Sequence, residues 1–128
     1  MTDDVSLWEV IIVEDQPDLA EVIAKILRFH KIRVHIANNG PECLELLQQL
    51  RPTLIISDLA MPGMDGWTLL DNLRANVATA NIPVVAITAY HSNEVADNAI
   101  RVGFDAYFPK PVDAGTFVTR LVEVFATA

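Results

Sequence analysis

The sequence Thr-Leu-Ile-Ile-Ser-Asp-Leu-Ala-Met-Pro-Gly-Met-Asp-Gly, residues 53–66, decides the fold of this chain. Its short apolar run from Leu54 to Ile56 is typical of a strand buried on both faces of a parallel sheet. The run leads to Asp58 and then to a loop rich in proline and glycine. Open α/β sheets place their active sites at the carboxyl ends of such strands, although a single Asp there also commonly caps a turn. Asp58 is therefore a candidate site residue, and its role depends on which other residues lie near it in the fold.

On both sides of this stretch, strand and helix patterns alternate. The other strands are predicted at residues 8–13, 33–37, 84–87 and 106–108. Helices are predicted from Pro17 to Leu27, from Asn39 to Leu50, from Gly66 to Leu73, from Ser92 to Val102 and from Asp113 to Phe125. Strands that alternate with helices predict an α/β fold, a parallel sheet with helices on both faces. Residues that follow the strands then gather along one edge of the sheet.

Composition limits the class of protein. A length of 128 residues predicts one domain, residues 1–128, with no effector domain after the last helix, either as a stand-alone regulator or as part of a longer protein. The net charge of −8 argues against direct nucleic-acid binding. The acidic start and the lack of a long apolar run predict no signal peptide and no membrane span. Single Cys43 excludes an internal disulfide and is expected to be a packed, inert thiol, which suits a cytoplasmic protein.

Five polar residues lie at the predicted strand ends: Glu14, Asp15, Asp58, Thr88 and Lys110. Each alone has an ordinary structural role, as a helix-start acid, a turn residue, a strand threonine or a surface lysine. Three converging acids would repel one another, which implies a hard divalent cation such as Mg²⁺. An Asp beside that cation can attack phosphorus, and a lysine and a hydroxyl can stabilise the phosphoryl oxygens. His30, His35 and His91 show no metal-ligand spacing and are interpreted as surface or packing residues.

From its first strand to its last helix, the sequence resembles the receiver domain of two-component response regulators. The motifs that carry the resemblance are residues 10–15 (Val-Ile-Ile-Val-Glu-Asp), 55–66, 87–90 (Ile-Thr-Ala-Tyr) and 110–111 (Lys-Pro). The resemblance implies a five-stranded sheet of order 2-1-3-4-5 in a flavodoxin-like, doubly wound sandwich. Glu14 departs from the Asp that many members have. Ala60 departs from a frequent polar residue, so the lifetime of a phosphorylated state does not carry over.

The resemblance also implies roles for the strand-end residues. Asp58 would accept a phosphoryl group from a sensor histidine kinase or a histidine phosphotransfer domain. Asp15, Asp58 and the backbone carbonyl of Ala60 would bind Mg²⁺, with Glu14 helping through water. Thr88 and Lys110 would contact the phosphoryl group, Tyr107 would be the aromatic switch residue, and the Lys110–Pro111 bond would be cis.

The expected function is thus a phosphoacceptor switch with at most self-catalysed phosphorylation and dephosphorylation. Its effector, or a second copy, would bind the surface formed by the fourth helix, fifth strand and fifth helix. A haloacid-dehalogenase-type phosphatase is the enzyme alternative, but that family has a second Asp where this chain has Ala60. A flavin carrier would need a Ser/Thr/Gly-rich loop after the first strand, where this chain has Glu14 and Asp15. A receiver that is not phosphorylated is disfavoured because all five site positions are suitably filled.

Overall fold

The computed structural model describes residues 4–125 and confirms the alternating pattern. Its strands are β1 (Glu9–Val13), β2 (Arg33–Ala37), β3 (Leu54–Asp58), β4 (Val84–Thr88) and β5 (Ala106–Pro109). Its α-helices are α1 (Pro17–Phe29), α2 (Gly40–Leu46), α3 (Gly66–Ala75), α4 (Asn93–Val102) and α5 (Phe117–Phe125). A 3₁₀ turn, Val5–Leu7, precedes β1. The predicted domain of residues 1–128 extends past the described residues at both ends.

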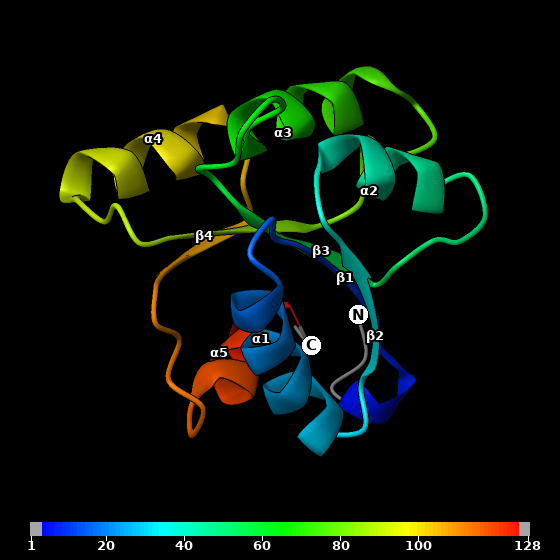
Figure 1. Cartoon of the computed structure of the whole chain (residues 1–128), viewed down its shortest axis with the longest axis vertical. Helices are drawn as coiled ribbons and strands as arrows, with labels where there is room; N and C mark the ends of the chain where they lie inside the picture. The colour runs from blue at the N-terminus through cyan, green and yellow to red at the C-terminus, as the bar shows by residue number, and fades with distance from the viewer. Residues whose placement is uncertain (1–3, 126–128) are drawn as a thin grey trace.

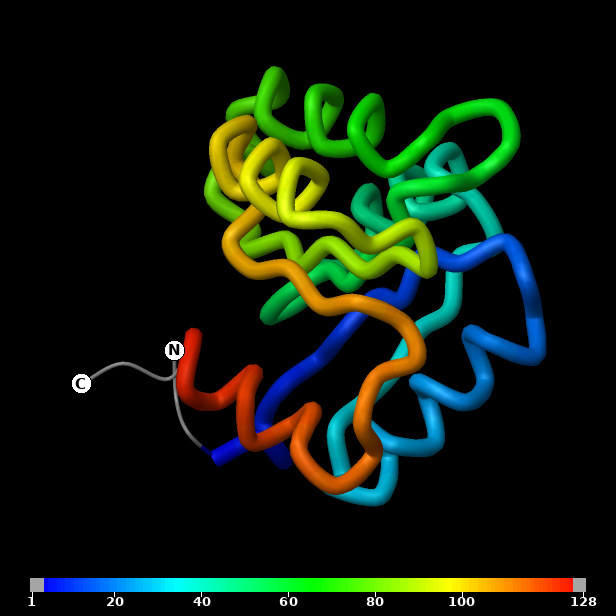
Figure 2. The backbone as a smooth tube through the Cα atoms, turned by 90° about the vertical axis from the view of Figure 1, so that its left-hand side faces the viewer, coloured from blue at the N-terminus to red at the C-terminus, as the bar shows by residue number. Residues whose placement is uncertain are grey.

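All five strands are parallel and form one sheet of order β2-β1-β3-β4-β5, as predicted. Helices α2, α3 and α4 cover one face, and α1 and α5 cover the other (Figure 1). The view of Figure 2 shows the same three layers from the side, with the blue α1 and red α5 beneath the sheet. Because the strands are parallel, their carboxyl ends share one edge.

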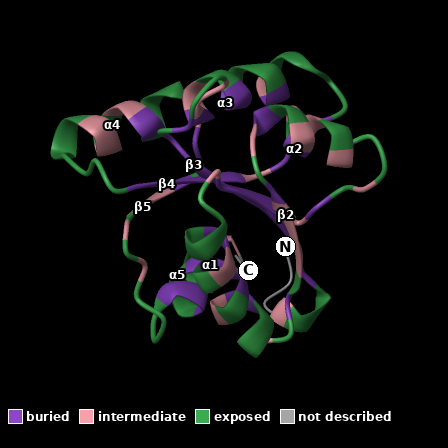
Figure 3. Ribbon diagram, in the orientation of Figure 1, coloured by how far each residue is buried: buried purple, intermediate pink, exposed green. Residues whose placement is uncertain are grey.

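The apolar core is divided by the sheet into two halves. Every residue of β3 and β4 is buried, as expected for strands covered on both faces (Figure 3). Alternate β1 residues enter opposite halves: Ile11 packs toward α2 and α3, and Ile12 packs toward α1 and α5. This packing fixes the direction of β1 and β3, and so the position of the acids that follow them.

Helices α1 and α3 each end two residues later than predicted, and two other helix boundaries differ by four residues. Helix α2 ends at Leu46 instead of Leu50, because its hydrogen bonds tighten into a turn in which the amide of Gln49 donates to the carbonyl of Leu46 at 3.0 Å. Helix α5 begins at Phe117, not beside Asp113. The Asp113 side chain instead accepts from the amide of Gly115 at 2.8 Å and caps a turn before the helix. The predicted Ser92 cap is confirmed: its hydroxyl accepts from the amide of Val95 at 3.1 Å.

At the opposite edge of the sheet from the strand-end acids, Arg74 joins α3 to the segment between α4 and β5. Its guanidinium donates to the carbonyls of Ile82 at 2.7 Å and Gly103 at 3.2 Å, and pairs with Asp105 at 3.1 Å. Asp105 also accepts from the amide of Val84 at 2.8 Å. Gly103 ends α4 with φ of +121°, a value that favours glycine. These bonds fix the end of α4.

Cys43 is buried in the core, and burial raises the pKa of its thiol to about 12. Its thiolate is therefore scarce at neutral pH, in agreement with the expected inert thiol. Among residues 4–125, no helix has both the length and the apolar character needed to cross a membrane.

Candidate functional site

The three predicted acids do converge. Glu14 and Asp15 follow β1, Asp58 ends β3, and one carboxylate oxygen from each lies within 4.8 Å of the others. Glu14 is fully buried and Asp58 is 4% exposed. Their place follows from the sheet, since β1 pairs with β3 in register and both end at the same edge.

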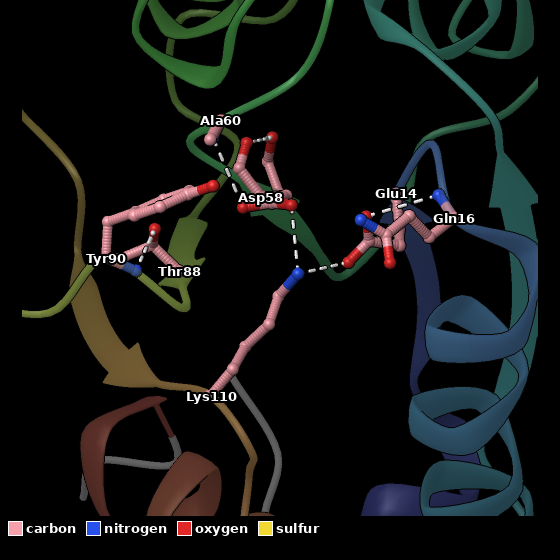
Figure 4. Close-up of polar contacts among 8 residues, drawn as sticks. Glu14, Gln16, Asp58, Ala60, Thr88, Tyr90 and Lys110 are labelled. Atoms are coloured by element: carbon pink, nitrogen blue, oxygen red, sulfur yellow. Dashed lines mark hydrogen bonds and ion pairs between the residues drawn. The ribbon is translucent and has the colours of Figure 1, made fainter.

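Lys110 lies between two of these acids. Its ammonium group pairs with Glu14 and lies 2.9 Å from Asp58 Oδ2 (Figure 4). Burial lowers the pKa of Lys110, but its hydrogen bonds to both carboxylates outweigh burial and leave that pKa raised. The charged lysine thus offsets part of the repulsion among the acids. The Lys110–Pro111 peptide bond is cis, as the resemblance implied.

Burial raises the pKa of the Glu14 carboxyl, while the hydrogen bond from Lys110 opposes that shift. The amide of Gln16 donates weakly to Glu14 at 3.4 Å. A buried carboxylate with so little hydrogen bonding needs nearby positive charge. Lys110 supplies one such charge, and a cluster of three acids beside one lysine favours a second cation.

The acid cluster has the oxygen donors that a divalent metal ion needs. Within the described part of the chain, Asp15 Oδ1 is a buried side-chain oxygen without a hydrogen-bond partner. A buried polar atom of this kind calls for a ligand. Carboxylate oxygens from Glu14, Asp15 and Asp58 are the donors that Mg²⁺ prefers. The predicted metal residues therefore suit a hard divalent cation.

The loop after β3 holds Asp58 in place. The amide of Ala60 donates to Asp58 Oδ1 at 3.2 Å, while the Ala60 side chain is exposed and apolar. Gly66, the first residue of α3, lies so close that a Cβ there would be 2.3 Å from the Asp58 carbonyl oxygen. Because Gly66 has no side chain, the start of α3 can pack directly against the backbone of Asp58.

We expect Gly66→Ala to displace Asp58 and to destabilise the fold by about 1–3 kcal/mol, because the new methyl group would overlap backbone atoms. Urea unfolding would measure the loss. Gly115→Ala is the matched control, since its Cβ would meet its nearest neighbour at 3.4 Å. Equal midpoints for Gly66→Ala and the unaltered protein would contradict the prediction.

Thr88 ends β4, and its side chain lies on the opposite side of Asp58 from Glu14 (Figure 4). The Thr88 hydroxyl accepts from the amide of Tyr90 at 3.1 Å. A cavity of about 500 Å³ opens beside Thr88, bordered by Ala60, Met61 and Tyr90 among others. Asp58 thus has Lys110 on one side and, on the other, Thr88 with open space.

Tyr107 lies on β5, where it pairs with Ala86 of β4. It is half-buried, and its hydroxyl lies 2.8 Å from Nδ1 of His91. The sequence interpretation left His91 as a surface or packing residue and missed this contact. The sequence did offer one indication of a role for His91, because it lies three residues beyond Thr88 in the loop that follows the strand end. His30 and His35 lie outside the acid cluster.

A model of the response regulator receiver domain matches residues 10–122. The chain is 36% identical over 120 residues to an uncharacterized 14.6 kDa protein of Leptolyngbya boryana, covering 94% of this chain and 91% of that protein. Three other curated relatives are longer, and the chain spans 8%, 54% and 22% of them.

Two solved structures share the fold. The Vibrio cholerae chemotaxis protein CheY4 has a TM-score of 0.84 at 26% identity, covering 91% of this chain and 98% of its own. The receiver domain of the Pseudomonas aeruginosa sensor histidine kinase PA1611, solved with a magnesium ion in its active-site cleft, has a TM-score of 0.83 at 25% identity. The match covers 94% of this chain and 98% of that one.

Proposed function

This chain belongs to the response regulator receiver domain family, and we propose that it accepts a phosphoryl group on Asp58 from a sensor histidine kinase or a histidine phosphotransfer domain. The observation that carries the proposal is the setting of Asp58. It ends a buried strand, lies 2.9 Å from the Lys110 ammonium and belongs to a cluster with an unpartnered Asp15 oxygen.

In the proposed reaction, a carboxylate oxygen of Asp58 attacks the phosphorus of a phosphohistidine. The new O–P bond forms as the P–N bond breaks, and the electron pair of that bond leaves with the imidazole. Lys110 then pairs with the phosphoryl oxygens, since its ammonium already lies beside the attacking carboxylate. The hydroxyl of Thr88 donates to another of these oxygens.

We assign a Mg²⁺ site to Asp15, Asp58 and the Ala60 carbonyl, with Glu14 acting through water. An ion held there would neutralise charge on the transferring phosphoryl group. The chain's own residues set the geometry: packing of β1 and β3 fixes the acids, and burial around Glu14 excludes solvent from one side.

The protein is a signalling switch whose catalysis is limited to its own phosphorylation and dephosphorylation. A dehalogenase-type phosphatase would use an acid at position 60, and Ala60 offers only its backbone there. The cytoplasm is the compartment in which such a kinase would meet it.

For the output partner, or a second copy, we propose the surface formed by α4, β5 and α5. Apolar side chains lie exposed on it: Ile100 is 52%, Val102 51% and Val124 41% exposed. Thr88 and Tyr107 connect it to Asp58, because β4 and β5 are neighbours in the sheet. With a net charge of −8, the chain is proposed to act through proteins and not by binding nucleic acid.

Incubation with acetyl phosphate tests the function. With Mg²⁺, intact mass spectrometry should show the gain of one phosphoryl group, and hydroxylamine should remove it, as it does from acyl phosphates. Omission of Mg²⁺ should abolish the gain. A protein that gains no labile phosphoryl group under these conditions would refute the proposal.

We expect beryllofluoride, a phosphoryl mimic, to change the α4–β5–α5 surface, because a ligand that favours one of two arrangements shifts their populations. Amide chemical shifts with Mg²⁺ and beryllofluoride should move at Tyr107, Ile100 and Val124. The exposed face of α2, for example Glu45, is the internal control. Changes confined to the surroundings of Asp58 would contradict this output surface.

A further inference from the structure

His91 and Tyr107 form a close pair across two elements. His91 lies in the loop between Thr88 and the Ser92 cap of α4, whereas Tyr107 lies on β5. Besides the 2.8 Å contact of Nδ1 with the hydroxyl, their rings lie 5.5 Å apart and are tilted by 31°. A ring contact together with a hydrogen bond restrains both the position and the rotation of the phenol.

The Tyr107 hydroxyl is placed near the start of α4, because its partner His91 directly precedes the Ser92 cap of that helix. In the hydrogen bond between them, the Tyr107 hydroxyl donates when Nδ1 of His91 carries no proton, and accepts when Nδ1 carries one. Tyr107 is therefore held near the start of α4 by its contact with His91.

The Tyr107 ring beside His91 is not turned toward Thr88, which is the other orientation that we consider. Tyr107 and Thr88 belong to neighbouring strands and lie on the same face of the sheet, where β4 has the small residue Ala86 opposite Tyr107. A ring that turned inward, over Ala86 and toward Thr88, would have to leave His91. The contact between His91 and Tyr107 is thus available to only one of the two orientations.

We propose that His91 is a positioning residue that holds Tyr107 outward and opposes the phosphorylated arrangement. This inference rests on the proposed switch role of Tyr107. By linkage, loss of the restraint favours the inward orientation and tightens binding of any ligand that prefers it. One hydrogen bond at an exposed site predicts an effect of about two- to tenfold.

The test is a calorimetric titration of beryllofluoride at saturating Mg²⁺. His91→Phe keeps an aromatic ring but cannot hydrogen-bond to the phenol, and its apparent Kd should fall about two- to tenfold. His91→Asn restores a hydrogen-bonding group and should return the Kd toward that of the unaltered protein. His30→Phe is the matched control, because His30 also contacts an aromatic ring, Phe29, but lies far from Tyr107 in the sequence.

A double-mutant cycle isolates the contact. In a Tyr107→Phe background, His91→Phe should have no further effect on the Kd. An unchanged or weaker affinity in His91→Phe alone, or the same tightening without the Tyr107 hydroxyl, would overturn the proposal.

A second readout separates this proposal from the function on which it rests. In the protein without ligand, His91→Phe should move the ring resonances of Tyr107, and His30→Phe should not. Absence of that movement refutes the restraint even if Asp58 is phosphorylated. Conversely, failure of Asp58 to accept a phosphoryl group, with the ring resonances moving as expected, refutes the switch function and its regulatory consequence, not the contact.

Discussion

Asp58→Asn should abolish the labile phosphoryl gain from acetyl phosphate and Mg²⁺. The amide is nearly the same size as the carboxylate, so the buried site is retained, but the amide oxygen is a far weaker nucleophile toward phosphorus. The expected result is complete loss, not slower labelling, because the other acids are placed to bind a cation. Intact mass after incubation, with and without hydroxylamine, measures it.

The control for this prediction is Asp65→Asn, which alters an acid seven positions further along the chain. The Asp65 side chain caps α3 by accepting from the amide of Thr68 at 2.8 Å, and asparagine is also a good cap. Asp65→Asn should label like the unaltered protein. If Asp58→Asn gained the same hydroxylamine-sensitive mass at the same rate, Asp58 would not be the acceptor.

Asp15→Asn should remove most of the stabilisation that Mg²⁺ gives the protein. At a Mg²⁺ concentration tenfold above its Kd, binding stabilises the native state by about 1.4 kcal/mol, which raises the melting temperature by about 5 °C in a domain of this size. Asp15 contributes the buried oxygen that lacks a partner, so its loss should reduce the increase to less than half. Thermal unfolding with and without Mg²⁺ measures the difference.

Asp18→Asn is the matched control, because it removes the same charge from an exposed position in the first turn of α1. The Mg²⁺ effect on the unaltered protein should also shrink as the pH falls through the raised pKa of Glu14, because the protonated carboxyl no longer helps to hold a cation. Equal Mg²⁺ shifts in Asp15→Asn and Asp18→Asn would place the metal elsewhere.

The strands and their polar ends could be predicted because each strand is a short apolar run ended by residues of a different kind. In a parallel sheet, that pattern alone brings Glu14, Asp58 and Thr88 to one edge. The helix ends were harder to predict. The leucine spacing of α2 continues to Leu50 although its hydrogen bonds change at Leu46, because apolar periodicity reports the buried face and not the bonding of the last turn.

The contacts of the site side chains were also beyond sequence reasoning. Lys110 and Glu14 are 96 positions apart, and only the folded structure shows that the lysine bridges two acids. His91 has no motif of its own, and its partner Tyr107 lies on another strand. Pairings of this kind depend on side-chain directions that spacing along the chain does not determine.

The bonds of Arg74 make α4 a lever with a fixed pivot. Its last turn is joined to α3 and β5 through Gly103 and Asp105, whereas the loop before its first turn contacts β5 only through His91 and Tyr107 among the bonds described above. We therefore expect a small displacement near Thr88 to rotate α4 about its Gly103 end and not to translate the whole helix. The distance moved by each α4 residue would then increase toward the first turn, so a partner bound there would sense the largest motion.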